Sequence, residues 1–313
     1  MVTEPMPTAA DMGRVAVMMG GASAERAISL ASGQTCLDAL VALGVDAEAF
    51  DPLPRPLADL TAFDRAFIAL HGPGGEDGTM QGALESLDIP YTGSGVLGSA
   101  LGMDKLRSKQ IWQALGLPTP AYRVVTSADS SAAVAQALGL PVFVKPLREG
   151  SSLGTTPVDR EDDLAAAVAA ARQYGEAALV ERCIVGTEYT VAVLGDEILP
   201  PIRIDVAEPF YDFEAKYRSE ATRMTIPCGL SAERESALQG LARDAFAAID
   251  ARGWGRVDVM ADERGDFWLL EVNTIPGMTD HSLVPAAAAA HGLDMATLVW
   301  RILLTSWRHG EAT

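Results

Sequence analysis

Short β-type runs alternate with helical stretches along the first ninety or so residues, and this alternation limits the fold more than any other feature of the chain. The run Arg14–Met19 stops at two glycines, and a helix over Ala24–Leu43 is expected to follow it, with Ser23 as its N-cap. Further strands are expected at Ala47–Phe50 and Ala66–Leu70. Because strands separated by helices pair in parallel, we predict a parallel sheet in an α/β fold.

The rest of the chain divides into further elements on the same grounds. The segment Pro90–Gly102, rich in Gly and Ser, is interpreted as a hinge between units. The length of 313 residues corresponds to two or three such compact units. Helices are expected at Thr79–Leu87, Lys105–Leu115, Ser130–Leu138, Leu164–Arg172, Ser231–Asp250, Leu283–Ala290 and Met295–Leu304, and strands at Tyr122–Val125, Val142–Lys145, Ala178–Glu181, Glu188–Leu194, Gly255–Met260 and Phe267–Asn273.

The charge balance and the cysteines exclude several classes of protein. The chain has 24 Lys and Arg against 42 Asp and Glu, a net charge of −18, so neither nucleic acid nor a membrane surface is expected as a partner. Its three cysteines form no CxxC pair, which argues against a disulfide framework or a zinc site. The segment Met1–Met12 has no basic residue of the kind that begins a signal peptide, and no apolar run approaches the ~18 residues of a membrane span. We therefore expect a cytoplasmic protein.

The segment Gly93–Gly98 matches the pattern GxGxxG of dinucleotide-binding proteins. That motif needs a buried strand before it and an acidic residue about 20 positions after it. The residues before it make a poor strand, and no Asp or Glu lies between Lys105 and Ala128. A flexible joint is therefore favoured here over a nicotinamide or flavin site.

A predicted hairpin near the C-terminus carries polar residues at every second position. Arg256 and Asp258 share one face of the first strand, and Glu271 and Asn273 share one face of the second. Pairing of the strands places two carboxylates and an amide oxygen together, a donor set that suits Mg²⁺ or Mn²⁺. The alternative is an ordinary solvated face of a hairpin. The apolar residues expected to face the core are Val257, Val259, Leu270 and Val272.

Two features favour a bound nucleotide and an anionic intermediate over a solvated hairpin face. A Pro-Gly turn follows the hairpin and can present the Gly277 backbone N–H to an oxyanion. The glycine-rich loop Arg148–Gly154 follows Lys145 and, with Lys105, can cradle phosphate; a flexible surface turn is the alternative. Glu181 and Glu188 flank another loop, where a carboxylate accepts hydrogen bonds from a ribose or adenine, or is merely solvated.

The ordered series of motifs resembles the D-alanine–D-alanine ligase family of the ATP-grasp superfamily. The resemblance extends from about Arg14 to Leu304, and the joint order of the motifs is much more specific than any one of them. The motifs are Met19–Arg26, Ala69–Gly72 with Gly75–Gly78, Tyr91–Gly95, Met103–Lys105, Val144–Pro146 through Gly150–Gly154, Tyr211–Tyr217, Gly255–Asp258, and Glu271–Thr274 through His281–Leu283.

The resemblance implies an α/β ATP-grasp fold of three domains. These are an N-terminal substrate-binding domain with a parallel sheet at residues 1–103, a central α+β domain at 104–187 and a C-terminal α+β catalytic domain at 188–313. A loop near 205–222 is expected to act as a lid over the site. The family also implies a homodimer.

The resemblance further assigns roles to individual residues. Glu25 binds the ammonium group of the first D-alanine, oriented by Ser151 and Tyr217 with His71 nearby, and Ser282 and the Leu283 backbone bind the second. Arg256 and the Gly277 backbone stabilise the tetrahedral oxyanion. Two Mg²⁺ or Mn²⁺ ions are bound by Asp258, Glu271 and Asn273. ATP contacts are assigned to Lys105, Lys145, Lys216, Ser151, Glu181, Cys183, Ile184 and Glu188.

The expected activity is the ATP-dependent joining of two D-alanines through an acylphosphate, for peptidoglycan synthesis. A ligase that takes D-lactate or D-serine as its second substrate is the nearest alternative. An inactive nucleotide-binding module is a second alternative, and the presence of Glu25, Arg256 and the proposed metal ligands argues against it. An ATP-grasp enzyme for an unrelated carboxylate is a third, and the segments around Glu25 and His281–Leu283 argue against it. Cys183 departs from the family, which usually has a larger residue near the adenine.

Overall fold

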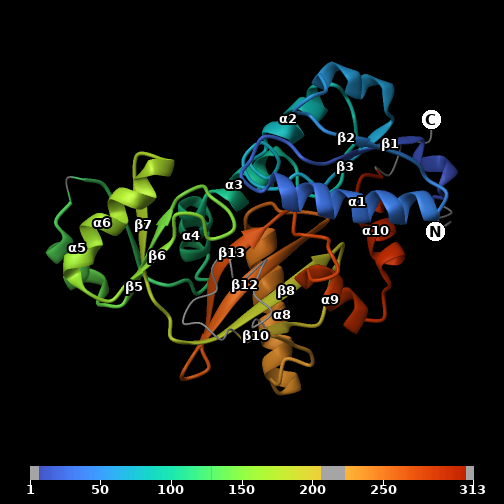
Figure 1. The fold of residues 1–313 in the computed structure, drawn as a ribbon. Coiled ribbons are helices and arrows are strands. Elements are labelled where there is room, and N and C mark those ends of the chain that lie inside the picture. The colour runs from blue at the N-terminus through green and yellow to red at the C-terminus, as the bar shows by residue number, and fades with distance from the viewer. Residues whose placement is uncertain (1–6, 128, 206–222, 308–313) are drawn as a thin grey trace.

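The computed structural model describes residues 7–127, 129–205 and 223–307, and in these ranges the strands form three sheets (Figure 1). The N-terminal sheet has the order β2 (Asp46–Phe50), β1 (Arg14–Met18) and β3 (Arg65–Ile68), and both pairs are parallel. The predicted parallel sheet is therefore confirmed. Its β1 strand is buried almost throughout, as expected for a strand with neighbours on both sides.

Helix α1 (Arg26–Ala42) begins later than predicted, and Ser23 is not its cap. The N-cap is Glu25, which makes no side-chain capping bond. The Ser23 hydroxyl instead donates to the His71 carbonyl oxygen at 2.7 Å and accepts from the Glu25 N–H at 3.2 Å. Ser23 therefore connects the glycine turn after β1 to the loop after β3. This connection helps to place Glu25 at the N-terminal end of α1.

The interpretation of Pro90–Gly102 as a flexible joint is wrong for its second half, which forms helix α3 (Val96–Met103) after the short helix α2 (Thr79–Ser86). Two glycines of α3 lie where a side chain would not fit. A Cβ at Gly98 would lie 2.3 Å from the Asp250 carbonyl oxygen, and one at Gly102 would lie 3.0 Å from the Thr274 side chain. The glycines therefore allow close packing of α3 on the C-terminal part of the chain.

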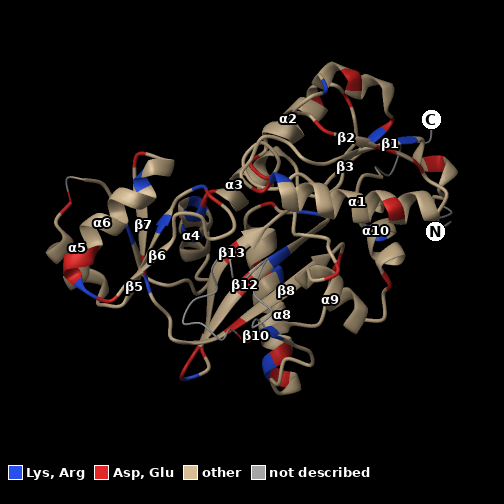
Figure 2. Ribbon diagram, viewed as in Figure 1, with Lys and Arg blue, Asp and Glu red and all other residues tan. Residues whose placement is uncertain are grey.

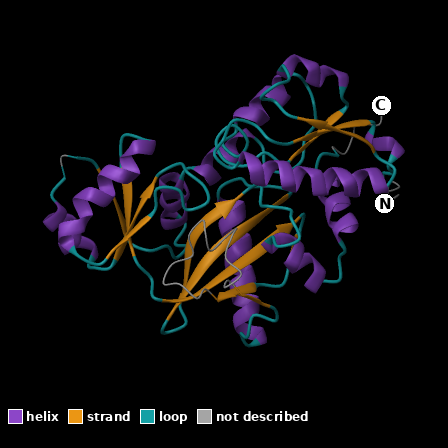
Figure 3. Ribbon diagram, in the orientation of Figure 1, coloured by secondary structure: helices purple, strands orange, loops and turns teal. Residues whose placement is uncertain are grey.

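The central sheet is antiparallel, with α5 (Ser131–Leu138) and α6 (Glu161–Ala171) covering its outer face (Figure 3). Val134 and Leu164 from these helices share a core with the sheet residues Val144 and Val180. The strand order is β4 (Tyr122–Val125), β7 (Ala178–Arg182), β5 (Val142–Pro146) and β6 (Thr156–Val158).

The third sheet is also antiparallel and packs on α8 (Ala232–Ala248), which contacts β8, β12 and β13. Helix α4 (Lys105–Ala114) joins this layer, because the Trp112 indole N–H donates to the Ala245 carbonyl oxygen at 3.0 Å. The strand order is β11 (Arg223–Thr225), β10 (Ile202–Asp205), β8 (Gly186–Leu194), β12 (Trp254–Asp262) and β13 (Phe267–Asn273), with β9 (Glu197–Ile198) paired to β8.

The last two helices return to the N-terminal sheet. Helix α10 (Met295–Leu304) packs against α1, and α9 (Leu283–Ala290) lies between it and β8. Among the described residues, no helix is by itself long and apolar enough to cross a membrane; only α9 and α10 taken together meet that test, with a 107° bend between them. Acidic residues occur over all three parts of the ribbon, with basic residues among them (Figure 2).

Candidate active site

The predicted polar hairpin is formed by β12 and β13, which pair antiparallel. Arg256 lies opposite Asn273 and Asp258 lies opposite Glu271. Directly opposed residues of antiparallel strands point to the same face with Cβ atoms about 5 Å apart. All four polar side chains therefore emerge on one face of the sheet, while α8 covers the other.

A β-bulge follows this quartet and changes one predicted orientation. The register shifts after Asp258, so that Val259 pairs with Leu269 and Leu270 is the extra residue. Leu269 is completely buried, whereas Leu270 lines the cavity between the central and third sheets. The prediction that Leu270 faces the core is therefore wrong, because strict alternation does not continue through a bulge.

Asp258 is the most strongly held member of the quartet. The Arg256 guanidinium donates to both of its oxygens, each at 2.9 Å, and the Thr190 hydroxyl donates to Oδ1 at 2.7 Å. The Asp258 side chain is only 5% exposed. A bidentate pair between adjacent same-face residues of one strand fixes the plane of the guanidinium. Thr190 was not predicted; it lies opposite Asp258 on β8.

The other two predicted metal ligands also have protein partners. Lys105 Nζ lies 3.3 Å from Glu271 Oε2, and Asn273 Oδ1 accepts from the Ile275 N–H at 3.0 Å. Among the described residues, no group of three or more His, Cys, Asp or Glu side chains lies close enough together to hold a metal ion. The donor chemistry still fits a hard cation, since two carboxylates and an amide oxygen share this face.

A cavity of about 280 Å³ lies between the central and third sheets, above the polar face of the hairpin. It is lined by residues from both sheets. The apolar part includes Phe143, Ile184, Met260 and Leu270, and the polar part includes Lys105, Lys145, Glu149, Glu181, Cys183, Glu188, Asp258 and Glu271.

Glu181 is not a solvated glutamate; it is 1% exposed and shared by two lysines. Lys145 Nζ donates to Oε2 at 2.7 Å, and Lys109 Nζ forms an ion pair with Oε1. Burial raises the pKa of the Glu181 carboxyl, but the two ammonium groups outweigh this effect and hold the pKa below its ordinary value. Burial lowers the pKa of Lys145, but Glu181 and further carboxylates outweigh it and the pKa is raised.

Lys109 was not predicted as a site residue. It is fully buried in α4, and burial lowers the pKa of its ammonium group despite the neighbouring Glu181. The available signal in the sequence is its position four residues after Lys105, on the same face of the helix.

The predicted phosphate loop is fastened to the start of α4. The Lys105 side chain donates to the Glu149 carbonyl oxygen at 2.5 Å, its N–H donates to the Leu147 carbonyl oxygen at 3.0 Å, and Arg148 Nε donates to Asp104 at 2.8 Å. Ser151 and Ser152 both have positive φ, at 48° and 59°. Both residues lie in a tight turn of the loop, and the backbone N–H groups of such turns can form concave anion-binding sites.

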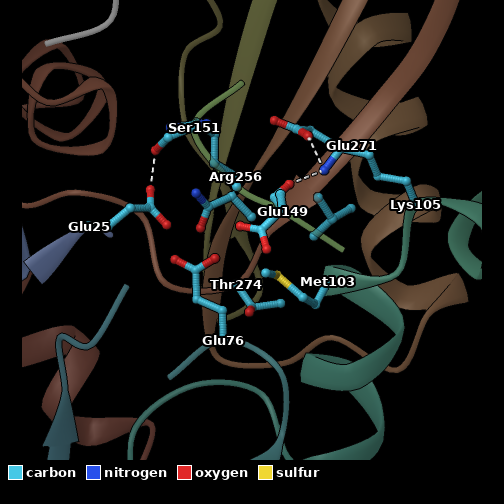
Figure 4. Close-up of a pocket in the computed structure, with 13 residues that line it drawn as sticks. Glu25, Glu76, Met103, Lys105, Glu149, Ser151, Arg256, Glu271 and Thr274 are labelled. Carbon is cyan, nitrogen blue, oxygen red and sulfur yellow. Dashed lines mark hydrogen bonds and ion pairs between the residues drawn. The ribbon is translucent and has the colours of Figure 1, made fainter. Parts of the chain in front are cut away.

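A second, smaller cavity of about 30 Å³ adjoins the first, and its lining includes Glu25 and Ser151, two of the residues predicted to bind the first D-alanine (Figure 4). The Ser151 hydroxyl donates to the Glu25 carboxylate across it, and Glu76 points into it from the opposite side. Lys105, Glu149 and Glu271 line both cavities, so the two are contiguous. Arg256 and Asn273 also line the smaller one.

Other predicted substrate residues lie outside the lining of the smaller cavity. His71 is 5% exposed, and its ring nitrogens contact the Ile275 carbonyl oxygen at 2.8 Å and Ser32 Oγ at 3.1 Å. Ser282 Oγ accepts from the Thr279 N–H at 3.0 Å, beside Gly277. These contacts hold the loop between β13 and α9 in place. Leu283, the first residue of α9, is buried.

The predicted lid at 205–222, with Lys216 and Tyr217, lies almost wholly outside the described residues, since residues 206–222 are not described.

Comparison with known proteins supports the interpretation of this site. Residues 54–94 match the family model for the D-ala D-ala ligase N-terminus, and residues 111–304 match the model for the D-ala D-ala ligase C-terminus. A D-alanine–D-alanine ligase of Alkalilimnicola ehrlichii is 57% identical over 300 residues, which cover 96% of each chain.

Solved structures agree over the same span. The D-alanine–D-alanine ligase of Bacillus anthracis complexed with ATP superposes with a TM-score of 0.83 at 32% identity, over 94% of this chain and 97% of that one. The VanG D-Ala:D-Ser ligase of Enterococcus faecalis has a TM-score of 0.83 at 28% identity, over 94% and 99%. The matched models, the full-length similarity and the shared fold show that this chain belongs to the D-alanine–D-alanine ligase family.

Proposed function

We propose that the two contiguous cavities are the two halves of one ligase site, in which ATP activates a first D-alanine and a second D-alanine then attacks it. The chain is a D-alanine–D-alanine ligase that makes a precursor of peptidoglycan, with ATP and D-alanine as substrates. The observation that supports this arrangement is the wall that the cavities share at Lys105, Glu149 and Glu271. A phosphoryl group bound at that wall is within reach of both compartments.

The larger cavity is proposed to hold ATP. Cys183 and Ile184 lie in the segment that joins the two sheets, where an adenine ring fits between the apolar walls. Glu181 and Glu188 supply hydrogen-bond acceptors for adenine and ribose. Phosphate contacts are proposed for Lys105, Lys145, Lys216 and Ser151.

The smaller cavity is proposed to hold the first D-alanine. Glu25 is 5% exposed, so its carboxylate is a strong partner for a substrate ammonium group. Ser151 and Tyr217 orient it, and His71 supports the neighbouring loop. Ser282 and the Leu283 backbone are proposed to bind the carboxylate of the second D-alanine, at the start of α9 where the helix dipole favours an anion.

Two Mg²⁺ or Mn²⁺ ions are proposed to bind Asp258, Glu271 and Asn273. When bound, such ions neutralise the triphosphate charge and so favour phosphoryl transfer. The two carboxylates are balanced by Arg256 and Lys105, and both of these side chains line the smaller cavity, where they are proposed to face the reacting groups.

The proposed reaction has two steps. The carboxylate of the first D-alanine attacks the γ-phosphorus of ATP, giving an acylphosphate and ADP. The amine of the second D-alanine then attacks the acyl carbon, loses a proton, and phosphate leaves. Arg256 and the Gly277 N–H are proposed to stabilise the tetrahedral oxyanion between these events. Water must be kept out because the acylphosphate hydrolyses readily. The segment 205–222 is therefore proposed to act as a lid that excludes water during the reaction.

Phosphate release from ATP tests this proposal directly. We expect D-alanine to stimulate release strongly and L-alanine to have no effect, with D-alanyl-D-alanine as the product detected by mass spectrometry. Mixtures of D-alanine with D-lactate or D-serine measure the choice of second substrate. Mixed products formed in preference to the dipeptide would contradict the assignment and favour the alternative that the VanG ligase represents.

Glu25→Gln is expected to raise KM for D-alanine about 10-fold or more while KM for ATP changes little. The substitution removes the negative charge that faces the substrate ammonium but keeps the shape and a hydrogen-bonding oxygen. Asp38→Asn is the matched control, since Asp38 is an exposed acidic residue on α1. Equal increases in both KM values for Glu25→Gln would argue against a contact with the amino acid alone.

The remaining proposals concern boundaries, assembly and location. We propose domains at 1–103, 104–187 and 188–313, and the segment 183–185, which joins the central and third sheets, lies close to the last of these boundaries. A homodimer is proposed from the family, and sedimentation measures it. A cytoplasmic location is proposed because the reaction consumes ATP.

A further inference from the structure

Lys109 is a fully buried lysine at the back of the larger cavity, and it does not line that cavity. Its ammonium group forms an ion pair with Glu181 and donates to Thr119 Oγ1 at 2.8 Å. A buried ammonium is costly unless it is paired and hydrogen-bonded, so a group placed here must have strong partners. Lys109 has partners in two different layers of the structure, because Glu181 belongs to the central sheet and Thr119 contacts the third.

The Glu181 carboxylate connects Lys109 to the cavity. Its second oxygen accepts from Lys145 Nζ at 2.7 Å, and both Glu181 and Lys145 line the cavity. Two ammonium groups and one carboxylate carry a net charge of +1. If Lys109 were absent, Glu181 and Lys145 would form a neutral pair, and the cavity wall at Lys145 would present a less positive potential to a phosphate.

A second connection leads from Lys109 to the apolar wall. Thr119 Oγ1 donates to the Leu269 carbonyl oxygen at 2.9 Å, and the Leu269 N–H donates to the Pro118 carbonyl oxygen at 2.8 Å. These bonds fasten the residues before β4 to β13 at the bulge. Leu270, the extra residue of that bulge, lines the cavity. The same lysine therefore supports a charged wall and an apolar wall of one cavity.

We propose that Lys109 is a positioning residue for nucleotide binding, which holds Glu181 and offsets its negative charge beside Lys145, and which fixes the bulge beside the adenine. This inference rests on the proposed assignment of the larger cavity to ATP. It assigns no contact between Lys109 and substrate.

The test compares nucleotide and amino-acid binding in a Lys109→Met variant. Loss of a supporting partner behind a binding residue typically weakens binding about 10- to 100-fold. We expect KM for ATP, and Kd for a non-hydrolysable ATP analogue measured by calorimetry with Mg²⁺, to rise by about 10-fold or more. KM for D-alanine is expected to stay within about twofold of the parent value, because the connections of Lys109 lead to the nucleotide end.

Arg107→Met is the matched control. It removes one positive charge from the same helix, at an exposed position where Arg107 contacts Gln110. We expect it to leave KM for ATP unchanged. An equal effect of the two substitutions would attribute the result to net charge and overturn the proposed role of Lys109.

A double variant keeps the test decisive where Lys109→Met destabilises the fold. Lys109→Met with Glu181→Gln removes both buried charges and leaves Lys145 with its positive charge. We expect the double variant to melt at a higher temperature than Lys109→Met. Glu181→Gln alone is measured beside it, because Glu181 is itself proposed to contact the nucleotide. The double variant is expected to bind the analogue less than about 10-fold more weakly than Glu181→Gln, since Lys109 acts on the charge beside Lys145 through Glu181. A loss of about 10-fold or more between these two variants would overturn the electrostatic route.

Binding of the analogue by the parent protein separates a failure of the ATP assignment from a failure of the proposed role of Lys109. A parent that binds no ATP analogue would refute the assignment of the cavity. A parent that binds it, together with a Lys109→Met variant that binds equally well, would refute the role of Lys109 alone.

Discussion

Arg256→Met is expected to lower kcat about 10²- to 10³-fold, the usual cost of removing one donor from a site that stabilises a developing oxyanion. The Arg256 side chain is only 12% exposed and its guanidinium is held in one plane by Asp258, so it is already oriented before substrate binds. Such preorganised positive charge acts in the transition state more than in the ground state. KM for ATP is therefore expected to change much less than kcat.

Arg252→Met supplies the control. Arg252 also pairs with an aspartate two residues away, Asp250, at 2.7 Å, but its side chain is 71% exposed. Exposed pairs of this kind contribute little, so activity and melting temperature are expected to stay near the parent values. Because Arg256→Met leaves the Asp258 carboxylate with fewer partners, Arg256→Lys is measured beside it. Lysine keeps the positive charge but cannot form the bidentate pair of hydrogen bonds with Asp258. Full activity in Arg256→Met would remove Arg256 from the reaction.

Asp258→Asn is expected to lower turnover on the order of 10²-fold at ordinary Mg²⁺, and raised Mg²⁺ is expected to restore part of it. The substitution keeps the size of the side chain and an oxygen for the Thr190 hydroxyl, so the fold is expected to persist. What it removes is one of two carboxylates on the polar face of the hairpin. The measurement is phosphate release as a function of Mg²⁺ concentration, with circular dichroism as a check of the fold.

Glu263→Gln is the control for this experiment, because Glu263 is exposed in the turn of the same hairpin. It changes the protein charge by the same amount without touching the polar face. If phosphate release by the parent and by Asp258→Asn reaches half its maximum at the same Mg²⁺ concentration, Asp258 does not bind the cation.

The hairpin was predictable because its information is local. A strand has a period of two, so the spacing of Arg256 and Asp258, and of Glu271 and Asn273, fixes their faces once the strands pair. The same rule failed at Leu270, because one extra residue in a bulge reverses the alternation of buried and cavity-facing side chains. The residue types around Leu270 do not indicate such a bulge. The helices α9 and α10 were predicted to the residue, each bounded by polar or glycine-containing turns.

The features that sequence alone missed depend on contacts between distant segments. Nothing near Lys109 indicates that it is buried, because the carboxylate that makes burial tolerable comes from β7, 72 positions later. The glycines of α3 suggested a flexible segment. The structure instead shows that a side chain at Gly98 would clash with the Asp250 carbonyl oxygen, which comes from a distant part of the chain. Ser23 was a reasonable helix cap by type, but its hydroxyl accepts from the Glu25 N–H in the turn before the helix, and α1 begins only at Arg26.

The packing of α10 on α1 has a consequence for biosynthesis. Val17 and Leu40 near the beginning of the chain share one core with Leu298 and Ile302 near its end, and Arg65 bonds both to the Met12 carbonyl oxygen and to Ser306. While the polypeptide is still emerging from the ribosome, the first sheet has no cover on that side. The hydrophobic core of the N-terminal unit is therefore complete only after α10 has been translated. We expect this unit to need the described C-terminal residues for its stability as much as its own strands.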